Sequence, residues 1–345
     1  MALVGERPSV GHHELMGNSR EPNLTATLRR RALGAARRAR DAGRLLSTGN
    51  VPAGRDPELL PAWPAPADQV MPPMYFGWTR YSAFYPDSKA FVVSREVPNP
   101  EAYKRQLWAA DRMITRSHVF LDLSVPLFQR MRERHDYRHV VTHSSDMPDP
   151  WQSQLHDAAD THDVLILQPV ESTKLHNTMK GHLIRTGSPS RVVVWFRIDD
   201  DDLLGLNYLD ELSQYANPHD RGRAVSMARG YSALWDEGSV THIRTAHRRL
   251  GSQGQAYVGW WDKDREEITF PRAGSHATVD DRMPTILDSR PHVFMQLRHV
   301  GQDTSTKLAG IEALRSKHTS VAGVQDLEPV FEQFPTLRGV YRPAP

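Results

Sequence analysis

The sequence predicts an α/β fold whose sheet is largely parallel in its first part and antiparallel in its last part. Short apolar segments rich in β-branched residues alternate with helical stretches between residues 89 and 198. This alternation is typical of parallel strands covered by helices. From Arg223 onward, β-like segments follow one another, which indicates an antiparallel addition.

The alternating part supplies four predicted strands and two predicted helical stretches. The helical stretches cover residues 100–132 and 149–159. Pro126 is expected to interrupt the first, because proline lacks the N–H that a helix interior needs. The strands cover residues 89–95, 137–142, 163–169 and 191–198. The antiparallel addition is expected to use residues 224–235, 239–245, 255–263, 267–271 and 292–300.

Two segments precede the predicted folded body of residues 75–345. Residues 1–47 begin with a polar stretch expected to be disordered. They continue in a predicted basic helix with seven arginines and one acid between residues 28 and 46. An amphipathic helix of this kind is expected to contact an anionic membrane surface or a partner. The alternative is a solvated helix that docks on its own domain. Residues 48–74 contain seven prolines and predict an extended linker.

The composition excludes several kinds of site and location. The chain of 345 residues has no cysteine, which excludes disulfides, thiolate metal sites and a cysteine nucleophile. It has no apolar run of the ~20 residues that cross a bilayer and no apolar stretch typical of a secretory signal at its start. We therefore expect a cytoplasmic protein, at the inner face of the membrane if the basic helix binds there. A net charge of +2 gives no reason to expect nucleic acid as a partner.

Four consecutive aspartates, residues 199–202, directly follow the predicted strand 191–198. That strand is almost continuously apolar, as strands covered on both faces are, and ligands of α/β sheets bind beyond the carboxyl ends of such strands. Adjacent carboxylates have raised pKa values unless a positive partner lies among them. Mn²⁺ or Mg²⁺ is the expected partner, because both ions prefer oxygen ligands. Capping of a predicted helix at residues 203–215 explains one or two of the aspartates, but not four.

Other chemistries lack local support in this sequence. The phosphate-binding loop, the dinucleotide-binding glycine pattern, the serine-hydrolase elbow and the zincin motif are all absent. His135, His139 and His143 are spaced by four residues. In a strand, that spacing separates neighbours by ~13 Å, so we interpret them as scattered polar histidines and not as a metal site.

Four segments that occur in a fixed order resemble a known family. These are residues 79–82 (TRYS), the stretch 112–126, residues 139–148 (HVVTHSSDMP) and residues 197–202 (RIDDDD). They resemble, in turn, the opening segment, a helix with its following turn, a strand that ends in serine and Met-Pro, and the DxD equivalent of a bacterial family of rhamnosyl transferases. The resemblance implies a GT-A glycosyltransferase with a Rossmann-like mixed sheet flanked by helices.

A later segment, residues 294–304 (FMQLRHVGQDT), extends the resemblance to about residue 310. His299 falls on the family's histidine, whereas Val300 and Asp303 stand where glycine and asparagine are usual. By resemblance, Asp201, Asp202 and His299 would hold a Mn²⁺ or Mg²⁺ ion. The nucleotide-sugar would be bound by Thr79, Arg80, Ser82, Ser144, Lys180, Arg197, Asp199 and Asp200. Within this set, Arg80, Lys180 and Arg197 are the cations expected to neutralise phosphate.

An inverting transfer also needs a carboxylate that deprotonates the acceptor hydroxyl. The candidates between the aspartate run and His299 are Asp236, Glu237, Asp280 and Asp281. We favour Asp281 or Asp280 as the catalytic base, because residues 274–282 form a polar segment typical of an active-site loop.

The function predicted from these residues is a metal-dependent, nucleotide-sugar-dependent hexosyltransferase. It would move a sugar, rhamnose by the family's label, from a nucleotide diphosphate to a hydroxyl of a glycan, lipid or protein. Two alternatives stay open. One is a metal-dependent phosphoester hydrolase that uses the same acids with a second metal cluster. The other is a non-enzymatic binding or assembly protein that acts through its basic N-terminal helix.

Overall fold

The computed structural model describes residues 71–85, 99–172, 174–300, 302 and 310–343. The predicted N-terminal segment 1–47, most of the linker 48–74 and the predicted strand 89–95 lie outside the described residues. The chain divides into two units, Met1–Leu59 and Leu60–Pro345, and the structure described below belongs to the second. Among the described residues, no helix is both long enough and apolar enough to span a membrane.

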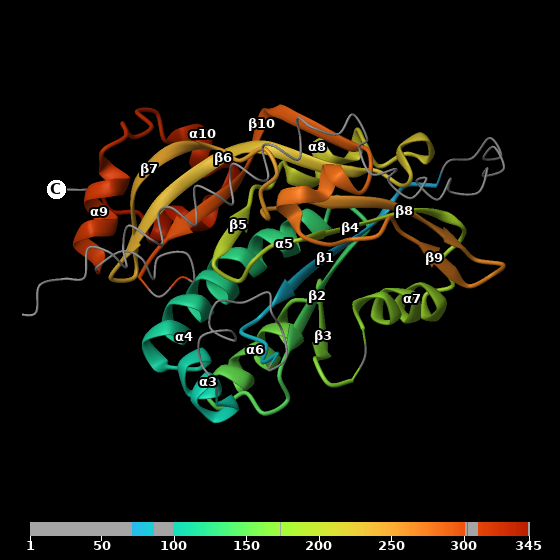
Figure 1. The fold of residues 1–345 in the computed structure, drawn as a ribbon, viewed down its shortest axis with the longest axis horizontal. Coiled ribbons are helices and arrows are strands. Elements are labelled where there is room, and N and C mark those ends of the chain that lie inside the picture. Colours follow the sequence, from blue (N-terminus) through green and yellow to red (C-terminus); the bar gives the residue numbers. More distant parts are fainter. Residues whose placement is uncertain (1–70, 86–98, 173, 301, 303–309, 344–345) are drawn as a thin grey trace, which may run out of the picture. The chain divides into compact units, whose positions relative to one another are not determined.

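The second unit is built on one mixed sheet of ten strands (Figure 1). The main path runs β3-β2-β1-β4-β8-β6-β10-β5, with β7 paired to β6 and β9 paired to β8. The strands are β1 (Met74–Arg80), β2 (Tyr137–His143), β3 (Leu165–Pro169), β4 (Arg191–Arg197), β5 (Asp202–Leu204), β6 (Ala224–Asp236), β7 (Ser239–His247), β8 (Ala256–Asp262), β9 (Glu267–Thr269) and β10 (Thr285–Arg298).

The two halves of the sheet differ in strand direction, as the sequence predicts. Strands β1 to β4 are mutually parallel, and β8 joins β4 in antiparallel register. The second half is not purely antiparallel, however, because β10 pairs with β6 in parallel. The predicted α/β fold with a mixed sheet is confirmed.

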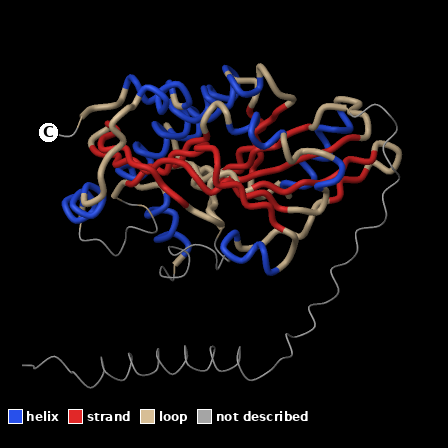
Figure 2. The backbone as a smooth tube through the Cα atoms, turned by 90° about the horizontal axis from the view of Figure 1, so that it is seen from above, coloured by secondary structure: helices blue, strands red, loops and turns tan. Residues whose placement is uncertain are grey.

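Helices lie on both sides of the strands, as the tube view shows (Figure 2). They are α3 (Pro100–Leu107), α4 (Ala110–Ser117), α5 (Val125–Arg132), α6 (Trp151–Thr161), α7 (Leu175–Arg185), α8 (Tyr208–Ser213), α9 (Ile311–Thr319) and α10 (Glu328–Gln333). Four shorter or irregular helical segments are η1 (His118–Ser124), η2 (Pro218–Asp220), η3 (His276–Asp281) and η4 (Pro335–Gly339).

Two of the predicted helices differ from the structure for physical reasons. Pro126 does not break the helical stretch, because it lies in the first turn of α5, where a missing N–H costs little. The π-type segment η1 leads directly into that turn. The predicted helix 203–215 is shorter at its start, since Leu203 and Leu204 belong to β5 and pair with β10. The helix α8 begins only at Tyr208.

Strand β4 lies between two apolar layers, which confirms that it is covered on both faces. Val192, Val194 and Phe196 belong to one core cluster, whereas Val193 and Trp195 belong to the other. The neighbouring strand β1 contains Gly77, whose added Cβ would lie 2.2 Å from His139 Nδ1. Glycine at this position therefore lets the buried His139 ring pack directly against β1.

Candidate functional site

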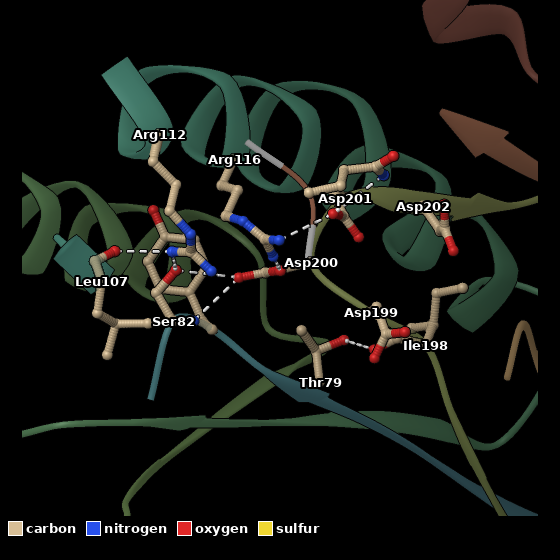
Figure 3. Close-up of polar contacts among 12 residues, drawn as sticks. Thr79, Ser82, Leu107, Arg112, Arg116, Ile198, Asp199, Asp200, Asp201 and Asp202 are labelled. Carbon is tan, nitrogen blue, oxygen red and sulfur yellow. Dashed lines mark hydrogen bonds and ion pairs between the residues drawn. The ribbon is translucent and has the colours of Figure 1, made fainter. Parts of the chain in front are cut away.

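The acidic segment, defined as Asp199–Asp202, lies at the carboxyl end of β4, beside the end of β1 (Figure 3). The Thr79 hydroxyl donates to the Ile198 carbonyl over 2.9 Å and fixes the two strand ends to each other. The segment then turns, with the Asp202 amide donating to the Asp199 carbonyl, and Asp202 opens β5. The site thus lies between the parallel half of the sheet and the β10–β5 pair.

Arg116 of α4 is the positive partner of two of the aspartates. Its guanidinium is paired with Asp200 Oδ1 and donates to Asp201 Oδ2 over 2.9 Å, and all three residues are buried. The other Asp200 oxygen accepts hydrogen bonds from the Ser82 amide at 2.9 Å and the Ser82 hydroxyl at 3.2 Å. Arg112, one turn before Arg116, donates to the same hydroxyl over 2.9 Å.

Asp201 is the most heavily contacted carboxylate of the segment. Its Oδ2 faces His299 Nε2 at 3.3 Å and accepts from the Gln302 side chain at 3.2 Å. Burial opposes ionisation of Asp201. The Arg116 charge and the His299 and Gln302 hydrogen bonds outweigh it and hold the pKa of this carboxyl below its usual value. Asp201 is therefore ionised at neutral pH.

The ring of His299 has a defined orientation. Its Nδ1 lies 2.8 Å from the Val300 carbonyl oxygen, and a carbonyl only accepts, so Nδ1 carries a hydrogen. Nε2 faces the Asp201 carboxylate, and it donates the hydrogen bond that lowers the Asp201 pKa only when the ring carries a hydrogen on both nitrogens. Two lone pairs at 3.3 Å repel each other unless a proton or a metal ion lies between them.

Asp202 and Asp199 have weaker partners than Asp200 and Asp201. Asp202 Oδ2 accepts from Gln253 over 2.7 Å, while its buried Oδ1 has no hydrogen-bond partner. Burial, followed by repulsion from Asp201 and Asp199, raises the pKa of Asp202 well above its usual value. Burial and the Asp201 charge also raise the pKa of Asp199, whose Oδ2 accepts from Ser252 at 3.3 Å.

Most of the predicted nucleotide-sugar residues gather around this segment. Ser82 contacts it directly, Thr79 contacts the preceding residue Ile198, and the charges of Arg197 and Arg80 both act on Asp199. Arg80 also lies over the Trp78 ring at 5.4 Å. Ser144 follows β2, and its hydroxyl accepts from the amide of Phe84, in the segment after β1, at 2.7 Å.

Three predicted residues are not brought to the acidic segment. Lys180 lies on α7, and among the described residues no hydrogen bond or ion pair joins it to the aspartates. Asp280 and Asp281 end the short helix η3 with exposed side chains. That helix is anchored to the loop before β8, because His276 is hydrogen-bonded to the Leu250 carbonyl at 2.7 Å. The same loop supplies the contacts of Asp199 and Asp202.

The three predicted metal ligands do not form a ready-made cluster. Asp201 and His299 face each other, but Asp202 points toward Gln253. Within the described ranges, no group of three or more acidic or histidine side chains is placed to hold a metal ion. The second metal cluster that the hydrolase alternative needs is likewise missing from this part of the chain.

The sequence did not single out Arg116, Gln253 or Gln302 as site residues. The sequence does contain an indication for Arg116, because Arg112 and Arg116 are spaced by four on a predicted helix and lie within the family-like stretch. Gln302 lies in the family-like segment 294–304, but at a position that the resemblance does not single out, and Gln253 belongs to a segment without any motif. Only the folded chain brings them within 3.2 Å of the aspartates.

A cavity of about 630 Å³ lies away from this site. It is formed by α4, η1 and α6, and its lining includes Ile114, His118, Asp122, Trp151 and Asp157. None of the four aspartates lines it.

Comparison with known proteins places the chain in one family. The profile described as "Putative rhamnosyl transferase" matches residues 75–311, more than half of the chain. No curated protein matches it. Three solved structures with a partial likeness are a 4-diphosphocytidyl-2C-methyl-D-erythritol synthase, S. aureus TarS 1-349 in complex with UDP-GlcNAc, and the inositol-1-phosphate CTP transferase from T. maritima.

These structural likenesses are weak. The synthase is 9% identical with a TM-score of 0.31, over 64% of this chain and 90% of that chain. TarS is 9% identical with a TM-score of 0.34, over 71% of this chain and 65% of that chain. The CTP transferase is 12% identical with a TM-score of 0.27, over 74% of this chain and 99% of that chain. We therefore rely on the family match and on the geometry of the site itself.

Proposed function

The chain belongs to the family described as "Putative rhamnosyl transferase", and we propose that it is a metal-dependent glycosyltransferase of the GT-A type. It transfers a hexose, rhamnose by the family's label, from a nucleotide diphosphate to a hydroxyl acceptor. The observation that carries the proposal is the acidic segment at the end of β4, where Arg116 neutralises only part of the negative charge. Ligands of α/β sheets bind at such strand ends.

The donor side of the site is formed by β1, β4 and α4. Arg80 and Arg197 lie close enough to Asp199 to act on its charge, and guanidinium groups suit phosphate oxygens. Ser82 has its hydroxyl and amide on Asp200, so Asp200 fixes the loop after β1 and leaves Asp199 for the nucleotide-sugar. Among the described residues, no hydrogen bond or ion pair joins Lys180 to the aspartates, so we give it no part in donor binding.

Asp201 and His299 would hold a divalent cation, and Asp202, which points toward Gln253 in this structure, would turn to become the third ligand. The buried Oδ1 of Asp202 has no partner, and the Nε2 lone pair of His299 faces a carboxylate oxygen at 3.3 Å. Carboxylate oxygens are ligands that both Mn²⁺ and Mg²⁺ prefer. When bound, the ion stabilises the charge that develops on the leaving nucleotide diphosphate.

The remaining roles fall to residues at the edge of the site. Asp281 or Asp280 is the proposed catalytic base, held on η3 next to the loop that contacts Asp199 and Asp202. We also propose that residues 1–47 and 48–74 form a membrane-contacting basic segment and a linker. In this proposal the protein works in the cytoplasm on a glycan, lipid or protein acceptor.

The direct test is release of nucleotide diphosphate from a panel of nucleotide-sugars, with Mn²⁺ or Mg²⁺ and without added metal. We expect metal-dependent release from one donor, abolished in Asp201→Asn and retained in Lys180→Gln. Asp281→Asn should slow transfer to an acceptor without weakening donor binding. No release from any donor, with release of phosphate from simple phosphoesters instead, would favour the hydrolase.

A further inference from the structure

A chain of buried hydrogen bonds runs from β2 through β1 to the start of the acidic segment. The Tyr137 hydroxyl lies 2.6 Å from His139 Nδ1, and His139 Nε2 lies 2.9 Å from the Thr79 hydroxyl. Thr79 in turn donates to the Ile198 carbonyl over 2.9 Å. Figure 3 shows this last contact beside Asp199. The chain therefore ends on the residue that directly precedes the four aspartates.

The direction of each hydrogen bond in the chain follows from its last acceptor. A carbonyl can only accept, so the Thr79 hydroxyl gives its single hydrogen to Ile198. The Thr79 oxygen must then accept from His139, which places the ring hydrogen on Nε2. Burial lowers the pKa of His139 to about 3, so the ring is neutral at pH 7. Its Nδ1 therefore accepts from the Tyr137 hydroxyl.

The surroundings of His139 hold its ring in this orientation. The ring is fully buried and stacks on Phe128 of α5 with 4.2 Å between centroids. Its Nδ1 occupies the space that the missing side chain of Gly77 leaves free. The side chains of Tyr137 and Thr79 are fully buried as well. A buried polar network in which every member has its partner is rigid and specifies one arrangement.

The start of the acidic segment depends on such a support. Consecutive carboxylates repel one another, so the backbone that carries them must be held in place. Asp200 is held by its contacts with Arg116 and Ser82. The carboxylate of Asp199 accepts a long hydrogen bond of 3.3 Å from a serine of the loop before β8. The Thr79 contact with Ile198 fixes the backbone immediately before it.

We propose that Tyr137 and His139 are positioning residues of the donor site. They orient the Thr79 hydroxyl, which holds the Ile198 carbonyl and so fixes the place where Asp199 meets the nucleotide-sugar. The nucleotide-sugar in this inference rests on the proposed transferase function. The chain of hydrogen bonds itself does not, so it can be tested without any ligand.

The first test is the ¹⁵N NMR spectrum of the histidine rings in the full chain, which distinguishes a ring nitrogen with a hydrogen from one without. The signals of His139 are assigned by their loss in His139→Gln. We expect a hydrogen on Nε2 and none on Nδ1 at neutral pH. A hydrogen on Nδ1, alone or together with one on Nε2, would overturn the direction of the chain and with it the inference.

The second test measures binding of the panel of nucleotide diphosphates with Mn²⁺. His139→Phe keeps an aromatic ring but removes both hydrogen bonds, and Thr79→Val removes the hydroxyl at nearly constant volume. Each should weaken binding about tenfold, as is typical when a partner that orients a binding group is lost. His139→Gln should recover part of the loss, because its amide can donate to Thr79. Tyr137→Phe, which removes only the far end of the chain, should cause a smaller loss.

The double variant of His139→Phe with Thr79→Val separates positioning from a general loss of stability. Both changes act through the same hydroxyl, so the double variant should bind no worse than Thr79→Val alone. The matched control is Thr178→Val on α7, whose hydroxyl donates to Gln168 over 2.8 Å. It should bind like the unaltered protein.

The outcomes distinguish this inference from the proposed function. Unchanged binding in His139→Phe, or losses that add in the double variant, would overturn the positioning role. If no nucleotide binds the unaltered protein, the transferase proposal fails instead. In that case the backbone amide NMR signals of residues 199–202 decide the positioning role. They should shift in His139→Phe and in Thr79→Val but stay unchanged in Thr178→Val.

Discussion

The two sides of the acidic segment differ in the partners that compensate their buried carboxylates. On the α4 side, Asp200 and Asp201 share the Arg116 guanidinium and several hydrogen-bond donors, so both are held in defined contacts. On the β5 side, Asp202 accepts from Gln253 and interacts with the Leu297 backbone, while its Oδ1 has no partner in hydrogen-bond geometry. The pKa of Asp201 lies below its usual value and that of Asp202 well above it, although the two residues are neighbours.

This difference separates a structural role from a binding role. On the paired side, Asp200 ties β1, β4 and α4 together and has protein partners on both oxygens. Asp201 shares Arg116 but also faces His299, where the cation is proposed. On the unpaired side, burial of the Asp202 carboxylate is unfavourable, and a cation or a ligand hydroxyl would relieve it. Natural proteins commonly retain such local instability at functional sites, so the β5 side is where we expect ligands to act.

The largest effect should follow from removal of the shared cation. Arg116→Leu leaves two buried carboxylates without their partner, and loss of one member of a buried ion pair costs about 3–5 kcal/mol. Denaturant unfolding should show this loss of unfolding free energy. Arg265→Gln, at a largely exposed pair with Asp262 at 3.8 Å, should change almost nothing. A loss below about 1 kcal/mol in Arg116→Leu would contradict the paired-side account.

Acid should destabilise the parallel half of the sheet through His139. This ring is hydrogen-bonded to Tyr137 and Thr79, and burial lowers its pKa to about 3 from 6.5. A base with a lowered pKa contributes stability that is present above pH 6.5 and is lost as pH falls toward 3, at about 1.4 kcal/mol per pH unit. His139→Gln should flatten the dependence of unfolding free energy on pH in this range. An unchanged slope would mean that the ring is already protonated in the fold.

Two neighbouring substitutions should change stability in opposite directions at pH 7.5. Asp201→Asn removes a charged acceptor from Arg116 and should cost about 2 kcal/mol. Asp202→Asn keeps an oxygen for Gln253 and removes an unfavourable buried charge, so it should stabilise the fold by about 1 kcal/mol. Parallel denaturant titrations of both variants measure this. Destabilisation of similar size in both would remove the distinction between the two sides.

The smallest effect is the pH dependence of Asp202. An acid with a raised pKa contributes stability that is fully present below its unfolded pKa of about 4 and is lost as pH rises through its folded pKa. The advantage of Asp202→Asn over the unaltered protein should therefore grow as pH rises above about 4. Thermal midpoints of both proteins at several pH values without metal would show it. A constant difference would mean that the Asp202 pKa is not raised in the fold.

The fold and the site differ in how far the sequence predicts them. Alternating strands and helices predict the parallel half, because each β-branched segment and its helix are local patterns. The parallel pairing of β10 with β6 is not predictable in this way, since it joins residues about sixty positions apart. Likewise, four aspartates after an apolar strand indicate a site, but the choice of Arg116 as their cation depends on where α4 packs.

The same limit applies to individual predicted residues. Thr79, Ser82 and Asp199–Asp202 come together because they lie at or just after the ends of adjacent parallel strands, which share one edge of the sheet. Lys180 is predicted as a cation that neutralises phosphate, and nothing in its local sequence indicates that α7 packs beside β9. His299 reaches Asp201 at 3.3 Å, although β6 to β10 separate the two residues in the chain.

One measurement tests the donor site most directly: thermal stability with a panel of nucleotide diphosphates, with and without Mn²⁺, in the unaltered protein, Asp201→Asn and Lys180→Gln. A ligand that binds only the folded state raises the midpoint by mass action. The account predicts that one nucleotide raises the midpoint only with Mn²⁺, that Asp201→Asn abolishes this rise and that Lys180→Gln keeps it. No rise with any nucleotide, or an equal rise in Asp201→Asn, would contradict it.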